Sequence, residues 1–323
     1  MYAFFKGNIV PIADAKISIL THAFHYGTAV FEGIRGNWND EDEQLYLFRD
    51  LDHFRRLRQS AKVLRMKVNQ SPEELSDIAK ELVRKCGLKE DQYVRPLVYK
   101  SAEVIANLRA HTLEDDLLML VVPFGNYLDP DHGIHCATSS WRRIDDLSIP
   151  PRAKVSGAYV NSVLAKTEAV ESGFDEAIML NHDGHIAEGA AENLFIVVDG
   201  KLITPAASDN ILMGITRETV IELAKEELGI ETLERTMDRS ELYLADECFL
   251  TGTAAHLSPV TKVDHRLVGD GEIGPITREL QGLYFAAIRG KNKKYMKWCT
   301  PAYPSAQPSQ PAKGALRSTP AGG

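Results

Sequence analysis

Two glutamates stand four residues apart in the stretch EGAAENLF, residues 188 to 195, where small residues separate them. On an ordinary surface both Glu188 and Glu192 would be solvated, because an unpaired carboxylate is costly to bury. The glycine and alanines between them let a ligand approach the backbone closely, and the apolar run LFIVV follows at once. The segment therefore predicts a carboxylate at the wall of a ligand site.

The segment MGITRE, residues 213 to 218, begins a helix after a loop rich in Ser, Asp and Asn. The first amides of a helix lack partners inside the helix, and the helix dipole favours an anion beside them. The amides of Ile215 and Thr216, next to a hydroxyl, could therefore bind a phosphate. Simple N-capping would give the same pattern, so this segment alone leaves both interpretations open.

Two more segments have the composition of a ligand site. In FLTGTAAHLSPV, a buried strand breaks at residues 252 to 255, where small residues either expose backbone amides to a ligand or merely turn the chain. In PRAKVSGAYV, Lys154 lies between a Pro-Pro loop and a helix start rich in small residues. Lys154 is a candidate functional residue, although most lysines lie on the surface.

The elements that position these segments are strands and helices in mixed order. The first half predicts a hairpin turning at residues 6–8, strands over TAVFEGIRG, QLYLF, QYVRPLVYK and DLLMLVVPF, and helices over 51–64 and from the capping box SPEEL to Gly87. The second half predicts the strand IHCATSSW, hairpins turning at 182–184 and 199–200, the strand ECFLTG, and helices over about 157–171, 215–228 and 276–290. Because regular βαβ alternation is missing, the fold class predicted is α+β, with two domains and largely antiparallel sheets.

Composition shifts suggest where the domains end. The polar segment GNYLDPDHG is the best linker candidate, so we expect an N-terminal domain over 1–124, a linker over 125–133 and a C-terminal domain over 134–290. The last 24 residues hold five of the fifteen prolines and almost no large apolar groups. We expect a disordered tail over 291–323.

Bulk composition excludes several classes of function. The 323 residues are 44% hydrophobic and 25% charged, and the net charge of -8 argues against nucleic acid as a partner. The four cysteines form no CxxC pair, which indicates free thiols in a reducing compartment. No apolar run approaches the ~20 residues that span a membrane. We therefore expect a cytoplasmic protein with no membrane partner.

Two weaker motifs have simpler explanations. GDGEIG, residues 269 to 274, matches G-x-G-x-x-G, but a dinucleotide site also needs a βαβ unit, and a tight hairpin turn ending at Pro275 explains the glycines better. Three H-x-x-H pairs would have to converge with further ligands to bind a metal, so we interpret them as turn and buried histidines and expect no metal site. The pairs are His22/His25, His132/His135 and His182/His185.

Taken together, the segments resemble the class IV aminotransferases, pyridoxal-phosphate enzymes of fold type IV, and most closely the branched-chain amino acid aminotransferases. The resemblance covers roughly residues 3 to 290 and implies a two-domain, D-amino acid aminotransferase-like α+β fold. It rests on HAFHYGTAVFEGIR, RLRQSAK, YVRPL, the K-x-x-G-x-Y of residues 154–159, IAEGAAENLF, GITR and LADECFLTGTAA, which stand in the expected order.

The resemblance implies a role for the first carboxylate. Glu188 would face the pyridine nitrogen of pyridoxal 5'-phosphate and keep it protonated, so that the ring acts as an electron sink. Lys154 would form the Schiff base with the cofactor and then move the proton between substrate and cofactor. Tyr159 would hydrogen-bond the phenolic oxygen of the cofactor. Glu192 is interpreted as a residue that holds the turn.

The resemblance also implies a phosphate site. The phosphate would lie on the amides of Ile215 and Thr216, with the Arg56 guanidinium from RLRQSAK and the Thr253 hydroxyl completing its shell. A dianion favours this combination of a helix N-terminus and a planar guanidinium.

The substrate site rests on fewer residues. The amides of Thr253 and Ala254 and the hydroxyl of Tyr93 would bind the α-carboxylate. Arg95, two residues beyond Tyr93 on one strand face, would either pair with the γ-carboxylate of glutamate or sit in a fixed ion pair. Four aromatic residues would form the apolar pocket, although core packing would explain each of them too: Tyr26, Phe31, Tyr127 and Tyr159.

The predicted reaction is transamination between L-branched-chain amino acids and 2-oxoglutarate. The alternatives are a D-amino acid or (R)-amine transaminase of the same fold, or a non-catalytic module that binds a phosphorylated ligand. Three features depart from the family pattern: Phe124 in place of a common tryptophan, His256 after GTAA, and a loop over 101–111 without the usual glycines. That loop is expected to cap the pocket of a neighbouring subunit, which implies a homodimer or a higher oligomer.

Overall fold

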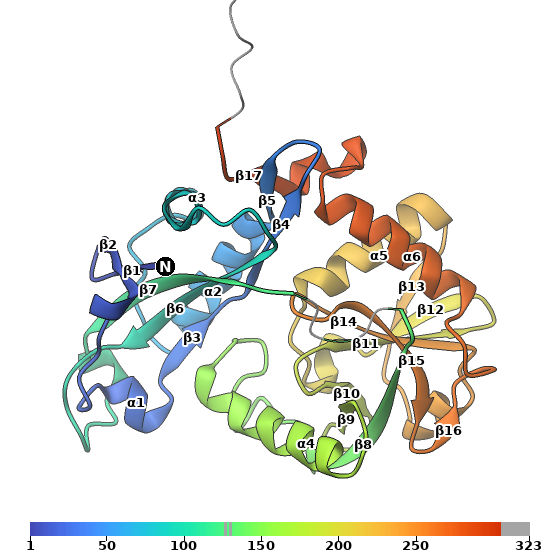
Figure 1. Ribbon diagram of the computed structural model, residues 1–323. Helices are drawn as coiled ribbons and strands as arrows, with labels where there is room; N and C mark the ends of the chain where they lie inside the picture. The colour runs from blue at the N-terminus through green and yellow to red at the C-terminus, as the bar shows by residue number, and fades with distance from the viewer. Residues whose placement is uncertain (126–127, 129–130, 305–323) are drawn as a thin grey trace, which may run out of the picture.

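The computed structural model describes residues 1–125, 128 and 131–304 of the chain. These residues form two lobes, each built on its own β-sheet, and the lobes meet along one side (Figure 1). We call the lobe on the first sheet the N-terminal domain and the other the C-terminal domain. The predicted two-domain α+β fold is thereby confirmed.

Within the described residues, the sheet of the N-terminal domain has eight strands, in the order β17-β5-β4-β6-β7-β1-β2 with β3 paired to β6, and its pairings are antiparallel. The strands are β1 (Tyr2–Phe5), β2 (Asn8–Pro11), β3 (Ala29–Phe31), β4 (Ile34–Asn39), β5 (Gln44–Phe48), β6 (Gln92–Lys100), β7 (Asp115–Pro123) and β17 (Cys299–Pro301). The helices are α1 (His22–Tyr26), α2 (Asp50–Val63) and α3 (Pro72–Cys86).

The sheet of the C-terminal domain has nine described strands, in the order β10-β9-β8-β15-β14-β11-β12-β13 with β16 paired to β15. It is mixed, because β8 runs parallel to β9 and β15, and β12 runs parallel to β13. The strands are β8 (Ile134–Arg142), β9 (Glu176–Leu180), β10 (Ile186–Gly189), β11 (Asn193–Val198), β12 (Lys201–Thr204), β13 (Thr232–Glu234), β14 (Glu247–Gly252), β15 (His256–Val263) and β16 (Arg266–Leu267). The helices are α4 (Tyr159–Glu171), α5 (Ile215–Leu228) and α6 (Pro275–Ile288).

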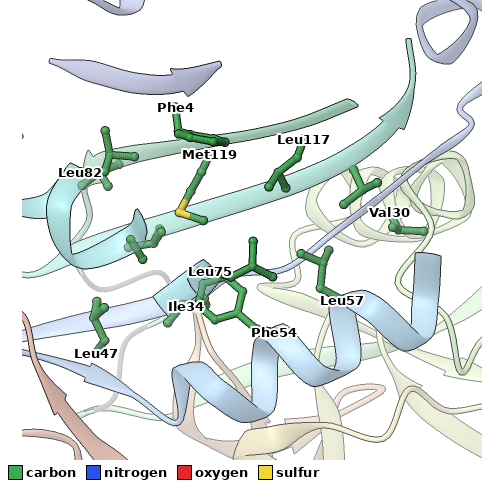
Figure 2. Close-up of a cluster of buried hydrophobic side chains, with 14 of the residues drawn as sticks. Phe4, Val30, Ile34, Leu47, Phe54, Leu57, Leu75, Leu82, Leu117 and Met119 are labelled. Carbon is green, nitrogen blue, oxygen red and sulfur yellow. The ribbon is translucent and has the colours of Figure 1, made fainter. Parts of the chain in front are cut away.

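The core of the N-terminal domain lies between the sheet and helices α2 and α3. Figure 2 shows Phe54 and Leu57 of α2 directed toward Leu117 and Met119 on β7, and all four side chains are buried. Two arginines of this region contact the C-terminal domain: Arg56 of α2 donates to the Met213 carbonyl, and Arg49, the N-cap residue of α2, donates to Thr219 Oγ1.

Helix α3 has the ends that its sequence predicts. The Ser71 hydroxyl accepts a hydrogen bond from the Glu74 amide at 3.1 Å, and the Glu74 carboxylate accepts one from the Ser71 amide at 2.7 Å. Gly87 ends the helix at φ +66°, a conformation that glycine adopts without a steric penalty. The capping box and the glycine stop are thus confirmed.

The expectation of a disordered tail from residue 291 is wrong for residues 291–304. Residues Lys293–Trp298 form a 3₁₀ helix, and β17 then pairs antiparallel with β5, with Cys299 opposite Phe48. The rings of Tyr295 and Trp298 stack with their centres 4.5 Å apart, and both side chains are buried. This C-terminal segment therefore buries apolar area, which the proline-rich composition of the sequence end did not indicate. Residues 305–323, and residues 126–127 and 129–130 of the expected linker, lie outside the described residues.

The glycine-rich segment GDGEIG is a loop and not the hairpin turn that the sequence suggested. The hairpin between β15 and β16 turns at Asp264 and His265, and GDGEIG connects β16 to α6. The first amides of α6 are taken by the protein itself, since the Glu247 carboxylate accepts hydrogen bonds from Ile276 N at 3.0 Å and Thr277 N at 2.7 Å.

We predict that Trp298→Ala lowers the free energy of unfolding by about 3 to 5 kcal/mol, because it leaves a large cavity beside Tyr295 and Phe48. Denaturant titration measures the effect. Trp141→Ala is the matched control: Trp141 is 43% exposed, and its loss should cost less than about 0.5 kcal/mol. Equal losses for the two variants would show that the C-terminal segment adds no packing energy.

Candidate active site

Two adjoining cavities lie between the domains and share Lys154, Tyr159 and Thr253 in their walls. The smaller cavity brings together the residues that the sequence assigned to the cofactor: Arg56, Lys154, Tyr159, Glu188, Ile215, Thr216 and Thr253. The larger one, about 810 Å³, brings together the following residues assigned to the substrate: Phe31, Tyr93, Arg95, Tyr159, Thr253 and Ala254. Segments from both domains are therefore needed to complete one site.

Lys154 is held at both ends. Its Nζ donates a hydrogen bond to the Tyr159 hydroxyl at 2.8 Å. Its backbone amide donates to Ser60 Oγ at 3.1 Å, and its carbonyl accepts from Phe31 N at 3.1 Å, so the N-terminal domain fixes the backbone. The side chain thus enters the cavity from a rigid base, with a hydroxyl as its only side-chain hydrogen-bond partner within the described residues.

A close approach of two glycines permits this arrangement. The Gly157 amide donates to the Gly27 carbonyl at 3.2 Å, and a Cβ on Gly27 would lie 2.8 Å from the Gly157 Cα. Gly27 also has φ +64°, so a side chain there would be disfavoured on both counts. The glycine of K-x-x-G-x-Y therefore brings the helix start against the N-terminal domain.

The Glu188 carboxylate is buried and surrounded by donors. Its Oε1 pairs with Arg143 Nε at 2.7 Å, and its Oε2 accepts from Asn193 Nδ2 at 3.0 Å and from Leu212 N at 3.1 Å. Burial raises the pKa of Glu188 above its ordinary value, and the Arg143 guanidinium opposes that rise. Neither sequence pattern nor resemblance pointed to Arg143 or Asn193 as partners of Glu188.

Helix α5 begins without a side-chain cap. Gly214 is its N-cap residue, and no side chain accepts a hydrogen bond from the first turn at this position. A Cβ on Gly214 would lie 2.0 Å from Asn193 Oδ1, which explains the glycine. The capping alternative for Ile215 and Thr216 is thus disfavoured, and both residues line the smaller cavity.

Arg56 of α2 lines the same cavity and is paired with a buried glutamate. Its Nε and one terminal nitrogen donate to Glu32 at 2.6 and 2.8 Å, and the other donates to the Met213 carbonyl at 2.7 Å. Three of the five guanidinium N–H groups are used in this way, which leaves two for a ligand. Although burial alone would raise the pKa of Glu32, Arg56 and His53 lower it well below its ordinary value.

Arg95 and Tyr93 lie together at the wall of the larger cavity. Arg95 donates to the Tyr93 hydroxyl at 3.2 Å, and its guanidinium lies 4.3 Å from the centre of the Phe31 ring. Among the described residues, no carboxylate forms an ion pair with Arg95. The geometry therefore favours a cation that rests on aromatic rings over the fixed ion pair that the sequence left open.

One residue assigned to the substrate pocket does not line it, and a second cannot be compared. Tyr26 is not among the described residues that line the two cavities; its hydroxyl accepts from Ala106 N at 2.9 Å, which ties it to the loop over 101–111. Tyr127 lies outside the described residues.

Glu192 is buried at the wall of the larger cavity, four residues after Glu188. Its Oε2 accepts a hydrogen bond from Ala191 N at 3.0 Å, and its carbonyl accepts from Gly189 N at 2.7 Å, so it holds the turn as expected. Burial and the nearby Glu176 carboxylate raise the pKa of Glu192 to about 8, although Lys166 opposes the rise.

The departure at His256 has a structural explanation. β15 begins at His256 and pairs with β14, with Gly252 opposite His256, so Thr253, Ala254 and Ala255 form the turn of a hairpin. From the sequence we predicted that the strand ends at this turn, and we did not predict β15. The His256 ring is buried against Tyr284 and Phe285, and burial lowers its pKa to about 3, so it is neutral.

Other kinds of site receive no support from the described residues. No group of three or more His, Cys, Asp or Glu side chains among them could hold a metal ion. None of the helices in the described part of the chain combines the length and apolar character needed to cross a bilayer.

Comparison with known proteins agrees with this geometry. The family described as amino-transferase class IV matches residues 29–263. That match spans most of the chain and both cavities, and the chain belongs to this family.

Several relatives resemble the chain over nearly its full length. A probable branched-chain-amino-acid aminotransferase of Aquifex aeolicus is 55% identical over 303 residues, which are 94% of this chain and 97% of the relative. The crystal structure of the branched-chain aminotransferase from Thermoproteus uzoniensis with norvaline has a TM-score of 0.90 at 44% identity and covers 94% of this chain and 99% of its own. The branched-chain amino acid aminotransferase of T.th., complexed with N-(5'-phosphopyridoxyl)-L-glutamate, has a TM-score of 0.88 at 41% identity, covering 94% and 98%. The predicted resemblance and fold type are confirmed.

We predict that Glu192→Gln removes a pH-dependent loss of stability. The folded protein holds the Glu192 proton up to a pKa of about 8, whereas the ordinary value is 4.5, so between these values the unfolded chain binds fewer protons and stability falls as pH rises. The advantage of the variant in free energy of unfolding should therefore grow from pH 5 to pH 8 and then level off. Denaturant titrations across this range measure it, and an advantage independent of pH would contradict the buried, protonated carboxyl.

Proposed function

We propose that this enzyme transfers the amino group of L-branched-chain amino acids to 2-oxoglutarate, with pyridoxal 5'-phosphate bound between the domains. The observation that carries the proposal is one cavity that holds a lysine amine on a tyrosine hydroxyl, a buried carboxylate paired with arginine, and an uncapped helix N-terminus. A phosphate binder alone has no use for the first two features. The names of the relatives support the same reaction.

The residues present fit this cofactor. Thr251 Oγ1 and Ser156 Oγ are buried at the cavity walls and have no hydrogen-bond partner among the described residues, as expected for groups that face a polar ligand. The phosphate would be held by the amides of Ile215 and Thr216, the two remaining N–H groups of Arg56 and the Thr253 hydroxyl. Glu188 would accept a hydrogen bond from the pyridinium N–H and so keep the ring nitrogen protonated. When bound, the cofactor supplies an electron sink for negative charge that develops at the substrate Cα.

The chain's own residues would then move the proton. Lys154 would take the proton from the substrate Cα and deliver it to C4′ of the cofactor. It is the one lysine among the described residues that borders both cavities. The Tyr159 hydroxyl, 2.8 Å from Lys154 Nζ, would orient the amine. Arg143 would keep Glu188 ionised in its buried position.

The larger cavity would position the substrate. The hairpin turn offers the amides of Thr253 and Ala254, and with the Tyr93 hydroxyl these would bind the α-carboxylate. Phe31 and Tyr159, whose ring centres lie 4.9 Å apart, would contact the aliphatic side chain. Arg95 would pair with the γ-carboxylate of glutamate and otherwise remain on the Phe31 ring. The relative complexed with a phosphopyridoxyl-glutamate supports a site that also accepts an acidic substrate.

We also propose a homodimer or a higher oligomer in the cytoplasm. Apolar side chains are exposed on the segment before α1 and on the loop over 101–111, including Ile19 at 80% and Leu108 at 78%, which supports a covered face. Tyr26 and this loop would reach the pocket of the second copy. The four cysteines are free, which suits a reducing compartment. Light scattering of the active enzyme tests the assembly.

We predict that Lys154→Ala loses transamination of L-leucine, L-valine and L-isoleucine while the protein stays folded. The Lys154 side chain borders a cavity, so its loss removes little packing. The measurement is turnover with 2-oxoglutarate, with circular dichroism as the folding control. Near wild-type turnover would refute the assignment. A wild-type enzyme that prefers D-alanine or (R)-1-phenylethylamine as donor would instead favour the alternative transaminases of this fold.

We predict that Arg95→Met lowers kcat/KM for 2-oxoglutarate by about 10- to 150-fold, equivalent to about 1.5 to 3 kcal/mol for a lost charge-assisted hydrogen bond. L-Leucine has no side-chain charge and serves as the internal control, with kcat/KM changed less than about threefold. Equal losses for both substrates would mean that Arg95 only maintains the shape of the pocket.

A further inference from the structure

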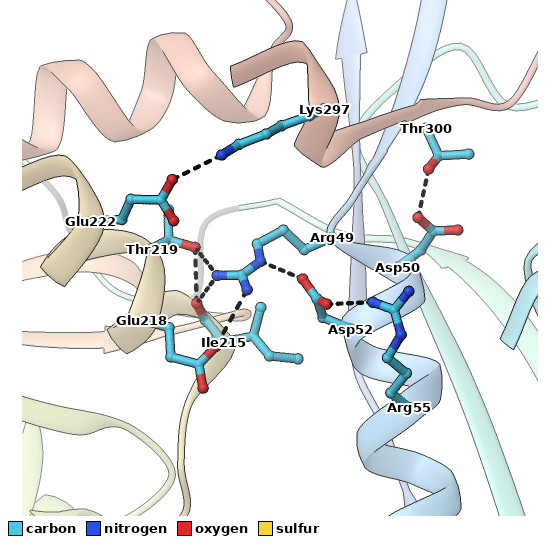
Figure 3. Close-up of polar contacts among 10 residues, drawn as sticks. All are labelled: Arg49, Asp50, Asp52, Arg55, Ile215, Glu218, Thr219, Glu222, Lys297 and Thr300. Carbon is cyan, nitrogen blue, oxygen red and sulfur yellow. Dashed lines mark hydrogen bonds and ion pairs between the residues drawn. The ribbon is translucent and has the colours of Figure 1, made fainter. Parts of the chain in front are cut away.

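Arg49, at the start of α2, reaches across to the C-terminal domain and contacts the first turn of α5 (Figure 3). One terminal nitrogen donates to Thr219 Oγ1 at 3.0 Å and to the Ile215 carbonyl at 3.3 Å. The other donates to Glu218 Oε2 at 3.3 Å. The guanidinium therefore holds the turn of α5 whose residues Ile215 and Thr216 line the smaller cavity.

Arg49 is itself firmly placed. Its Nε pairs with Asp52 at 2.7 Å, its backbone amide donates to the Trp298 carbonyl at 2.7 Å, and its guanidinium lies 5.6 Å from the centre of the Trp298 ring. The side chain is only 11% exposed. A second contact joins the same segments, since Lys297 pairs with Glu222 of α5 at 3.0 Å.

The position of Arg49 relates the two halves of the phosphate site. Helix α2 carries Arg49 at its start and Arg56 two turns later, while α5 carries Ile215 and Thr216. A phosphate bound by Arg56 and by these amides would bridge the domains, so its affinity depends on how firmly α2 and α5 are held relative to each other.

We propose that Arg49 is a positioning residue that sets the phosphate site by fixing the first turn of α5 against α2. The proposal rests on the proposed function, because it assumes that the cavity binds pyridoxal 5'-phosphate. The planar fork of arginine suits three acceptors at once, whereas the single ammonium of a lysine cannot reproduce this geometry. Arg49 would not contact the cofactor.

The test measures cofactor affinity and needs no turnover. Apo wild-type, Arg49→Lys and Thr219→Val proteins are titrated with pyridoxal 5'-phosphate and, separately, with pyridoxal, which lacks the phosphate. Thr219→Val removes an acceptor of Arg49 with little change in volume or charge. Arg55→Lys is the matched control, because Arg55 lies on the same helix and pairs with the other oxygen of Asp52 at 2.8 Å, and in the described structure it makes no hydrogen bond or ion pair to α5.

We expect Arg49→Lys and Thr219→Val to weaken pyridoxal 5'-phosphate about tenfold, comparable to the loss of one hydrogen bond, and to change the affinity for pyridoxal less than about twofold. Arg55→Lys should match the wild type for both ligands. Wild-type affinity in Arg49→Lys would overturn the proposal, because positive charge alone would then suffice. Equal losses for both ligands would overturn it too, since they indicate general loosening of the fold.

The same experiment distinguishes a failure of the proposed function from a failure of the role proposed for Arg49. A wild-type protein that binds no pyridoxal 5'-phosphate would overturn the proposed function together with the role of Arg49. A wild-type protein that binds it, with variants that bind equally well, would overturn the role of Arg49 alone. If Arg49→Lys folds poorly, Thr219→Val gives the decisive comparison.

Discussion

Burial favours the neutral form of a carboxylate unless donors replace the water it has lost, and three elements supply such donors to Glu188. Arg143 at the end of β8 supplies the opposite charge, Asn193 on β11 supplies an amide, and Leu212 supplies a backbone N–H ahead of α5. These contacts tie the sheet of the C-terminal domain to the loop that leads into α5. The same set of bonds thus surrounds the carboxyl group and joins it to the loop before α5.

The N-terminal domain supplies the remaining residues of the site. Arg56 faces the start of α5 and is locked by the buried Glu32, while Ser60 and Phe31 fix the backbone of Lys154. A site divided in this way needs a fixed distance between its halves. The contacts of Arg49 and the C-terminal segment over 291–304 supply several of the bonds that join the two domains.

Local signals in the sequence were sufficient for most elements. The capping box at Ser71, the strand-forming residues of QYVRPLVYK and the helix end at Gly87 each depend on neighbours within a few residues, and the structure has these elements where they were predicted. β15 was missed because its residues follow a turn of small residues with a polar start. The C-terminal strand β17 was missed because it is stabilised by β5, about 250 residues earlier in the chain.

The site residues also divide into those that the sequence indicated and those that only the fold brings together. Lys154 and Glu188 could be named from the sequence because the motifs that contain them resemble those of the class IV aminotransferases. Their partners could not, since Arg143 and Asn193 meet Glu188 only through the sheet. Glu32 did carry a signal, as an acid within the apolar run AVFEGI, and its full burial shows that such a residue needs a cation.

The central claim is that the buried Glu188 carboxylate serves the reaction and not the retention of the cofactor. Glu188→Gln with bound pyridoxal 5'-phosphate, mixed with L-leucine in a single turnover, tests it directly. Glu247→Gln is a control for the loss of a buried glutamate, because Glu247 caps α6 away from both cavities. We predict that Glu188→Gln keeps about one cofactor per chain and reacts on the order of a hundredfold more slowly than the wild type. Glu247→Gln should react at the wild-type rate. An unchanged rate in Glu188→Gln would contradict the role of Glu188 in the reaction.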